Sequence, residues 1–110
     1  MKTINHWING KNVASKEYFT TTNPANGEVL AEVASGGQLE IDQAVAAAKE
    51  AFPKWANTPM KERARLMRRL GELIDQNVPQ IAELETADTG LPIHQTKNVL
   101  IPRPSHNFEF

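Results

Sequence analysis

Short runs of β-branched and aromatic residues, separated by turn-forming residues, fill the beginning of the chain. The segment Trp7–Val13 has the pattern of a strand, a turn and a strand, and its Asn9-Gly10 pair supplies the two positive φ angles of a type I′ turn. Tyr18–Thr22 and Val29–Val33 are predicted as strands because they are rich in strand-forming residues. Residues 1–34 are therefore predicted to form a β-hairpin region, which needs cover from other parts of a protein.

Apolar residues recur at helical spacing after Gly36-Gly37. This stripe predicts a helix with acidic residues in its first turn, where they suit the helix dipole. Pro53 is expected to end or kink that helix, because proline donates no backbone hydrogen bond and clashes with the preceding turn. The stripe consists of Ile41, Ala44, Val45, Ala48, Phe52 and Trp55.

A second helix is predicted to open at Thr58-Pro59, with Thr58 as N-cap and Pro59 as the first helical residue. Pro79 is expected to start a further helical stretch, and Gly90 to end it in a left-handed conformation. Residues 93–101 fit either a helix or an extended segment. Pro102-Arg103-Pro104 fits poorly inside a helix. The apolar face of the second helix comprises Leu66, Met67, Leu70, Leu73 and Ile74.

Ser105 follows these prolines and is a candidate cap for a restarted helix. The fold class is therefore predicted as an α+β fragment: a β-hairpin region over residues 1–34, followed by three or four helices over residues 38–110. The chain ends on Phe108-Glu109-Phe110, whereas termini usually fray in polar residues. We therefore expect the functional unit to be longer than this chain.

The composition narrows the function classes. The chain has 110 residues, 12 Lys and Arg against 13 Asp and Glu, and a formal net charge of −1. This balance gives no basic footprint, so no nucleic-acid partner is expected. No apolar run approaches the roughly 20 residues of a membrane span, and no secretory signal is apparent, so we expect a cytoplasmic protein without a membrane partner. The chain contains no cysteine, which excludes a thiol nucleophile within it.

The candidate chemistry is sparse. The basic residues of the second helix suggest an anion site, but the nearby Glu62, Glu72 and Asp75 favour a solvated helix face. His6, His94 and His106 lack the spacing of a zinc site, and no glycine-rich phosphate loop is present. The basic residues are Lys61, Arg63, Arg65, Arg68 and Arg69.

Asp88 and Arg103 merit closer attention. A carboxylate near a helix C-terminus is unfavourable beside the negative end of the dipole. Asp88 is therefore expected to accept a hydrogen bond from the next turn or to bind a cation, and the hydrogen bond is favoured. Arg103, between two prolines, is either an ordinary exposed arginine or a preordered partner for a carboxylate, and its spacing alone favours the exposed arginine.

Several stretches in order resemble the beginning of the NAD(P)-dependent aldehyde dehydrogenase family. The resemblance covers the whole chain but only the start of that α/β fold, and it implies that residues 1–110 form the amino-terminal part of the cofactor-binding domain. The stretches are Trp7–Lys11, Asn23–Leu30, Ile41–Ala48 with Ala51, Phe52 and Trp55, then Pro59 followed by Glu62–Leu66 and Leu70, and Glu85–Pro92.

The resemblance also implies that the groups that carry out the reaction lie outside this chain. The family's cysteine nucleophile, glutamate base and NAD site have no counterpart here, so the chain alone is expected to have no catalytic residues and to bind no cofactor. The complete parent is expected to be a homo-oligomer that uses NAD to oxidise a dicarboxylic semialdehyde in the catabolism of aromatic compounds. The backbone carbonyl of Thr22 and the carboxylate of Asp88 would hold a structural monovalent cation, and Arg103 would bind a substrate carboxylate.

Two other interpretations stay open. The chain could be a non-catalytic interaction module that pairs with a second chain, which an ordered monomeric fold would favour. Exposed apolar stripes would instead favour a fragment whose helices have lost the sheet that they cover. A small anion-binding protein is a third interpretation, supported only by the basic helix.

Overall fold

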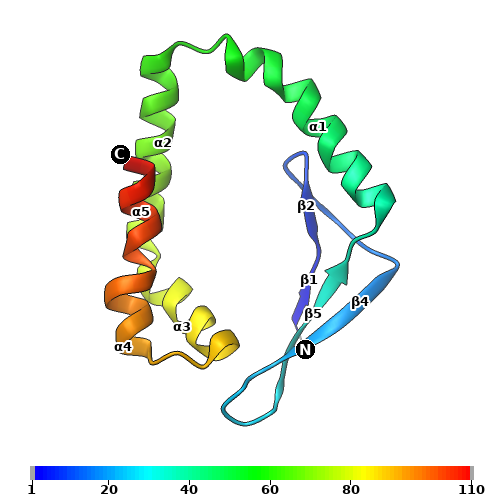
Figure 1. The fold of residues 1–110 in the computed structure, drawn as a ribbon, viewed down its shortest axis with the longest axis vertical. Coiled ribbons are helices and arrows are strands. Elements are labelled where there is room, and N and C mark those ends of the chain that lie inside the picture. The colour runs from blue at the N-terminus through cyan, green and yellow to red at the C-terminus, as the bar shows by residue number, and fades with distance from the viewer. Residues whose placement is uncertain (1, 110) are drawn as a thin grey trace. The chain divides into compact units, whose positions relative to one another are not determined.

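The computed structural model describes residues 2–109, which divide into two compact units (Figure 1). The first unit contains the residues up to Thr22 together with Glu28–Asn57. The second contains Asn23–Gly27 together with the residues from Thr58 onward. No helix within residues 2–109 is both long and apolar enough to cross a membrane.

The first unit is built on a three-stranded sheet with the strand order β1-β5-β4. Strands β4 (Glu17–Thr22) and β5 (Val29–Ser35) are antiparallel and confirm the two strands predicted there. Strand β1 (Lys2–Ile4), which the sequence did not predict, pairs with β5 in parallel. Ala31 and Ala34 of the central strand β5 are buried, so the centre of this sheet is formed by small side chains.

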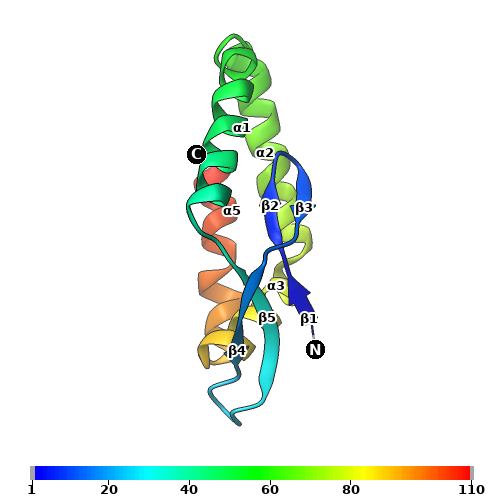
Figure 2. The same ribbon diagram turned by 90° about the vertical axis from the view of Figure 1, so that its right-hand side faces the viewer.

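A separate two-stranded hairpin consists of β2 (His6–Ile8) and β3 (Lys11–Val13), and Figure 2 shows it apart from the β4-β5 pair. Its turn residues have φ angles of 54° at Asn9 and 73° at Gly10. These values confirm the two positive φ angles expected of a type I′ turn.

Helix α1 (Gln38–Ala56) completes the first unit, and none of its residues is buried. The N–H of Gly37 donates to Oε2 of Glu40 at 2.9 Å and caps the helix start. Pro53 lies inside the helix, so of the two expected outcomes, an end or a kink, the helix end is wrong. Only three residues follow Pro53, and the proline ring removes a single hydrogen bond in this last turn.

Helices α2 (Met60–Gln76) and α3 (Val78–Thr89) belong to the second unit. Helix α2 begins one residue later than expected, with Pro59 rather than Thr58 at the N-cap position. Proline has no N–H to be satisfied there, and its extended backbone leads directly into the helix. Helix α3 starts around a proline and ends at Gly90, whose φ of 79° confirms the predicted left-handed end.

The ambiguous segment after Pro92 is helical. It forms a short turn, α4 (Ile93–Gln95), a π-helical turn, η1 (Thr96–Leu100), and helix α5 (Pro102–Glu109). Pro102-Arg103-Pro104 forms the first turn of α5 rather than a helix interior, and the expectation that Ser105 would cap a restart is wrong because Ser105 lies inside α5. Both prolines fall in the first turn of α5, where the N–H groups have no partner within the helix in any case.

Helix α5 runs alongside α2 in the second unit, as both ribbon views show. Gly71 of α2 is buried against α5: a Cβ at this position would lie 3.1 Å from the carbonyl oxygen of Ser105. Ala82, Thr96 and Ser105 are completely buried, whereas the larger apolar residues of α2 remain partly exposed. The interior of this unit is therefore small and consists mainly of short side chains.

Candidate functional site

Arg103 lies in the first turn of α5, and its side chain is exposed. The two prolines that flank it belong to the same turn, so the backbone that carries the guanidinium is helical and constrained. The structure thus presents Arg103 on a rigid element.

Thr22 and Asp88 belong to different units, and each is described within its own. Thr22 ends strand β4 beside an irregularity in the pairing between Thr21 and Thr22. Asp88 lies in the last turn of α3 with an exposed side chain. Among residues 2–109, no group of three or more His, Cys, Asp or Glu residues is arranged to hold a metal ion.

The last turn of α3 is closed by the neighbours of Asp88. Thr89 Oγ1 donates to the carbonyl oxygen of Glu85 at 2.7 Å and accepts from the N–H of Leu91 at 3.3 Å. The N–H of Gly90 donates to the carbonyl oxygen of Thr86 at 2.9 Å. The hydrogen bond into the next turn that was favoured for Asp88 is thus made by Thr89. A threonine hydroxyl can make it because it both donates and accepts.

A hollow of about 400 Å³ lies beside α3 in the second unit. Two of its polar side chains are engaged: Asn23 Oδ1 accepts from the N–H of Ala25 at 2.9 Å, and the hydroxyl of Thr86 lies 2.8 Å from that of Thr96. The sequence predicts the turn at residues 23–28 and the helix before Gly90 separately, but it does not predict that the two are in contact. The lining residues are Asn23, Ala25, Glu83, Thr86, Ala87, Gly90 and Ile93.

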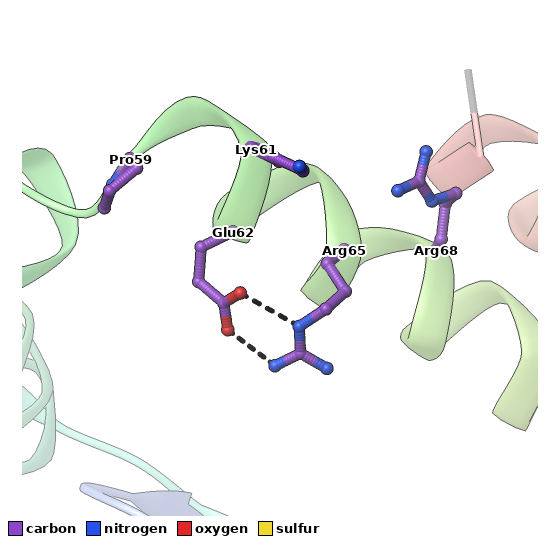
Figure 3. Close-up of a pocket in the computed structure, with 5 residues that line it drawn as sticks. All are labelled: Pro59, Lys61, Glu62, Arg65 and Arg68. Atoms are coloured by element: carbon purple, nitrogen blue, oxygen red, sulfur yellow. Dashed lines mark hydrogen bonds and ion pairs between the residues drawn. The ribbon is translucent and has the colours of Figure 1, made fainter.

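The basic face of α2 borders a hollow of about 280 Å³, shown in Figure 3. Glu62 accepts two hydrogen bonds from the Arg65 guanidinium, 2.9 Å from Nε and 2.5 Å from Nη2. This pair lowers the pKa of the Glu62 carboxyl and raises the pKa of Arg65. Arg69 forms a second ion pair, with Glu72, at 3.1 Å. These exposed pairs agree with a solvated helix face rather than an anion site.

Three polar side-chain atoms are buried without a hydrogen-bond partner within residues 2–109: His6 Nε2, Arg63 Nε and Ser105 Oγ. They come from different elements and do not form one cluster in the sequence. Burial of such groups is decided by packing, so nothing in the sequence marked them.

Comparisons with known proteins assign the chain to one family. The sequence profile described as "Aldehyde dehydrogenase family" matches residues 7–110. The 5-carboxymethyl-2-hydroxymuconate semialdehyde dehydrogenase of Escherichia coli is 84% identical over 110 residues, which are 100% of this chain and 24% of that protein. The chain therefore spans about a quarter of the length of this relative.

Solved structures give the same result for the fold. The crystal structure of HpcC from Thermus thermophilus matches with a TM-score of 0.95 and 37% identity over 99% of this chain and 21% of that chain. The structure of PnpE in complex with nicotinamide adenine dinucleotide matches with a TM-score of 0.93 and 30% identity over 96% of this chain and 22% of that chain. The chain has the fold of the amino-terminal part of these enzymes, as the resemblance implied.

Proposed function

Because the chain belongs to the aldehyde dehydrogenase family, we propose that it supplies the amino-terminal scaffold of a dehydrogenase for 5-carboxymethyl-2-hydroxymuconate semialdehyde. The observation that carries this proposal is the 84% identity to the E. coli enzyme along the whole chain. A dehydrogenase of this type oxidises the aldehyde of its substrate to the acid, as a step in the breakdown of an aromatic compound.

In this function, the groups that make and break bonds belong to the remaining part of the enzyme. The chain has no cysteine, so a thiolate that attacks the aldehyde must come from the remaining three quarters of the enzyme. NAD, when bound to the complete enzyme, supplies the hydride acceptor. The role of residues 2–109 is to hold neighbouring elements in place. By itself the chain is expected to turn over no aldehyde and to bind no NAD.

A chimera tests this function directly. The chain is joined in frame to the part of the E. coli relative that it does not match, and NADH formation is followed with the semialdehyde as substrate. The chimera should approach the kcat/KM of the E. coli enzyme, and the isolated chain should give no NADH above background. A chimera that folds but oxidises other aldehydes in preference would contradict the proposed substrate.

The substrate assignment extends to Arg103. A substrate that carries carboxylates besides its aldehyde needs cationic partners, and an arginine binds a carboxylate through two parallel hydrogen bonds. The exposed side chain of Arg103 on the rigid first turn of α5 supports this role. In the chimera, Arg103→Met should raise KM for the dicarboxylic substrate about tenfold or more and leave an uncharged aldehyde unaffected. Equal effects on both substrates would exclude a carboxylate contact.

We also propose a structural monovalent cation at the carbonyl oxygen of Thr22 and the carboxylate of Asp88. These are hard oxygen donors, and the exposed Asp88 carboxylate at the negative end of α3 would be stabilised by a bound cation. The remaining ligands would come from the rest of the enzyme. The melting temperature of the chimera should rise when potassium replaces a bulky organic cation, and Asp88→Asn should abolish that rise. A rise that persists in Asp88→Asn would refute the assignment.

The alternative of a self-standing interaction module receives less support. An ordered module would cover its own apolar residues, but Phe52 is 65% exposed and Met60 78% exposed. Exposed apolar helix faces are what a segment of a larger enzyme shows when its neighbours are missing. Monomeric, reversible folding of the isolated chain without binding of a hydrophobic dye would favour the module instead.

A further inference from the structure

The π-helical turn η1 directly precedes the helix that carries Arg103. The turn is closed by the N–H of Ile101, which donates to the carbonyl oxygen of Thr96 at 2.9 Å, so this bond spans five residues instead of four. Turns of this kind are rare in proteins and are frequently found at functional sites. The extra residue in η1 changes which side of the helix each later residue faces.

This change of register decides the direction of Arg103. In an uninterrupted α-helix, Arg103 would follow Thr96 by about 700° and would lie within about 20° of the same side. Thr96 is completely buried, so that register would turn Arg103 inward. The π-turn rotates the later residues back by about 100°, which brings Ile101 and Ser105 toward the buried side and Arg103 to the opposite side. Ile101 and Ser105 are indeed buried, and Arg103 is exposed.

The hydroxyl of Thr96 ties the start of η1 to α3. It lies 2.8 Å from the hydroxyl of Thr86 and 3.4 Å from the carbonyl oxygen of Ala82, both in α3. The carbonyl oxygen of Ile93, in its own helical segment, is 3.1 Å away. Because a hydroxyl has one hydrogen and two lone pairs, Thr96 can donate to one carbonyl oxygen while it accepts from Thr86. A shift of the turn would break these buried bonds.

The end of the segment is held by α2. Ser105 is completely buried, and a Cβ at Gly71 of α2 would lie 3.1 Å from its carbonyl oxygen, so the two helices are in close contact there. With the start fixed on α3 and the end fixed on α2, the five-residue step from Thr96 to Ile101 requires a π-turn. Arg103 lies between the two fixed points.

Resting on the proposed function, in which Arg103 binds a substrate carboxylate, we propose that Thr96 is a positioning residue for that arginine. The buried hydroxyl holds η1 in the π-helical register, and this register directs the guanidinium to the exposed side. Thr96 is completely buried and acts through the backbone of η1 rather than by touching the substrate. A turn that relaxed to the α-helical register would rotate Arg103 toward the packed side of its helix, and the paired hydrogen bonds to a carboxylate would be lost.

Steady-state kinetics of the chimera test this role. Thr96→Val keeps the shape of the side chain and removes its hydroxyl. We expect KM for the dicarboxylic semialdehyde to rise at least about threefold, with kcat and the KM for an uncharged aldehyde unchanged. Thr96→Ser keeps the hydroxyl and should bring KM to within about twofold of the unmodified chimera. Equal effects on both substrates, or no effect on either, would overturn the proposal.

A double-mutant cycle with Arg103→Met separates positioning from a general loss of stability. If Thr96 acts through Arg103, Thr96→Val should change KM by less than about 1.5-fold once residue 103 is methionine. An equal rise in KM in both backgrounds would show that Thr96 acts elsewhere.

Amide hydrogen exchange of the chimera follows the turn itself. Thr96→Val should speed exchange over residues 96–101, because the bond from the Ile101 N–H that closes η1 is less firmly held. Unchanged exchange over this segment would refute the role of the Thr96 hydroxyl in holding η1.

Thr89→Val is the matched control, because it removes from α3 a threonine hydroxyl that also makes two hydrogen bonds. It should lower the melting temperature and leave KM for the dicarboxylic substrate within about twofold. If Thr96→Val does not fold, Thr86→Val removes the partner hydroxyl from the α3 side and should raise KM in the same way.

The same kinetics distinguish this proposal from the function on which it rests. An unchanged KM in Arg103→Met would contradict the carboxylate contact of the proposed function, and the positioning role with it. A raised KM in Arg103→Met, with an unchanged KM in both Thr96→Val and Thr86→Val, would leave the proposed function intact and overturn the positioning role alone.

Discussion

Pro24 lies directly against Gly90: a Cβ at Gly90 would be 2.9 Å from Cγ of the proline. Gly90 also has a φ of 79°, in the left-handed region at the end of α3. The contact joins the Asn23–Gly27 turn to α3 within the second unit. Two independent constraints therefore disfavour a side chain at residue 90.

We expect Gly90→Ala to lower the free energy of unfolding by about 2 kcal/mol or more, measured by urea denaturation. The left-handed backbone costs an alanine about 1 kcal/mol, and the contact with Pro24 adds to it. Gly27→Ala is the control, because Gly27 has a φ of 75° and a Cβ added there would meet no atom within 4 Å. It should cost only about 1 kcal/mol. Equal losses of unfolding free energy in the two variants would show that Pro24 moves away from residue 90 without cost.

Thr96 is completely buried, and its hydroxyl lies 2.8 Å from the hydroxyl of Thr86 and 3.1 Å from the carbonyl oxygen of Ile93. Thr96→Val keeps the shape and removes the hydroxyl, so we expect a loss of about 1–3 kcal/mol in stability. The double variant with Thr86→Val should lose less than the sum of the two single variants, because neither threonine hydroxyl is then left behind without the other. Additive losses would show that the two hydroxyls act independently.

Glu40 stabilises the start of α1 in a pH-dependent way. The N–H of Gly37 donates to its carboxylate and lowers the pKa of Glu40, and the N–H of Glu40 and the charges of His6 and Lys16 act in the same direction. Because this pKa is lower in the folded than in the unfolded chain, the stabilisation is fully present above the unfolded-state pKa. It is lost as the pH falls through the folded-state pKa.

Glu40→Gln should therefore be less stable than the unmodified chain at neutral pH, and the difference should shrink in acid. Urea denaturation as a function of pH measures this difference. Glu50→Gln, at an exposed position on the same helix, should leave the pH dependence unchanged. A difference at Glu40 that stays constant with pH would show that the charge is irrelevant.

Gly71 keeps α2 and α5 in close contact, since a Cβ there would meet the backbone carbonyl oxygen of Ser105 at 3.1 Å. Gly71→Val should force the helices apart and cost about 1–3 kcal/mol. Ala64→Val, at an exposed position of the same helix, measures the helix propensity of valine alone. Thermal unfolding should show a clearly larger loss for Gly71→Val, and similar losses would mean that α5 adjusts without strain.

The sequence anticipated features that depend on neighbouring residues. The Asn9-Gly10 turn, the strand pair β4-β5 and the left-handed Gly90 follow from backbone preferences over a few residues. The extent of α1 past Pro53 and the start of α5 at Pro102 were missed, although the cause is local too. Pro102 falls in the first turn of α5, where an N–H has no partner within the helix, whereas Pro53 removes one hydrogen bond with only three helical residues still to follow.

For the candidate site residues too, the sequence predicted some features, and the structure was needed for the others. Arg103 stands out because two prolines flank it, but its place in the first turn of a helix had to come from the structure. Thr89 rather than Asp88 closes the turn after α3, since a short side chain with a donor and an acceptor reaches both groups. The sequence order suggested a hydrogen bond there and did not decide which residue makes it.

From the sequence alone came the succession of strands and helices, the absence of a thiol nucleophile and the apolar stripe of α1, because each depends on residue type and spacing along the chain. The tertiary structure decided the parallel pairing of β1 with β5, the complete burial of Thr96 and Ser105, and the approach of Pro24 to Gly90. These features join segments that are far apart in the chain. Their stability comes from burying surface and pairing polar groups across that separation, which no local pattern encodes.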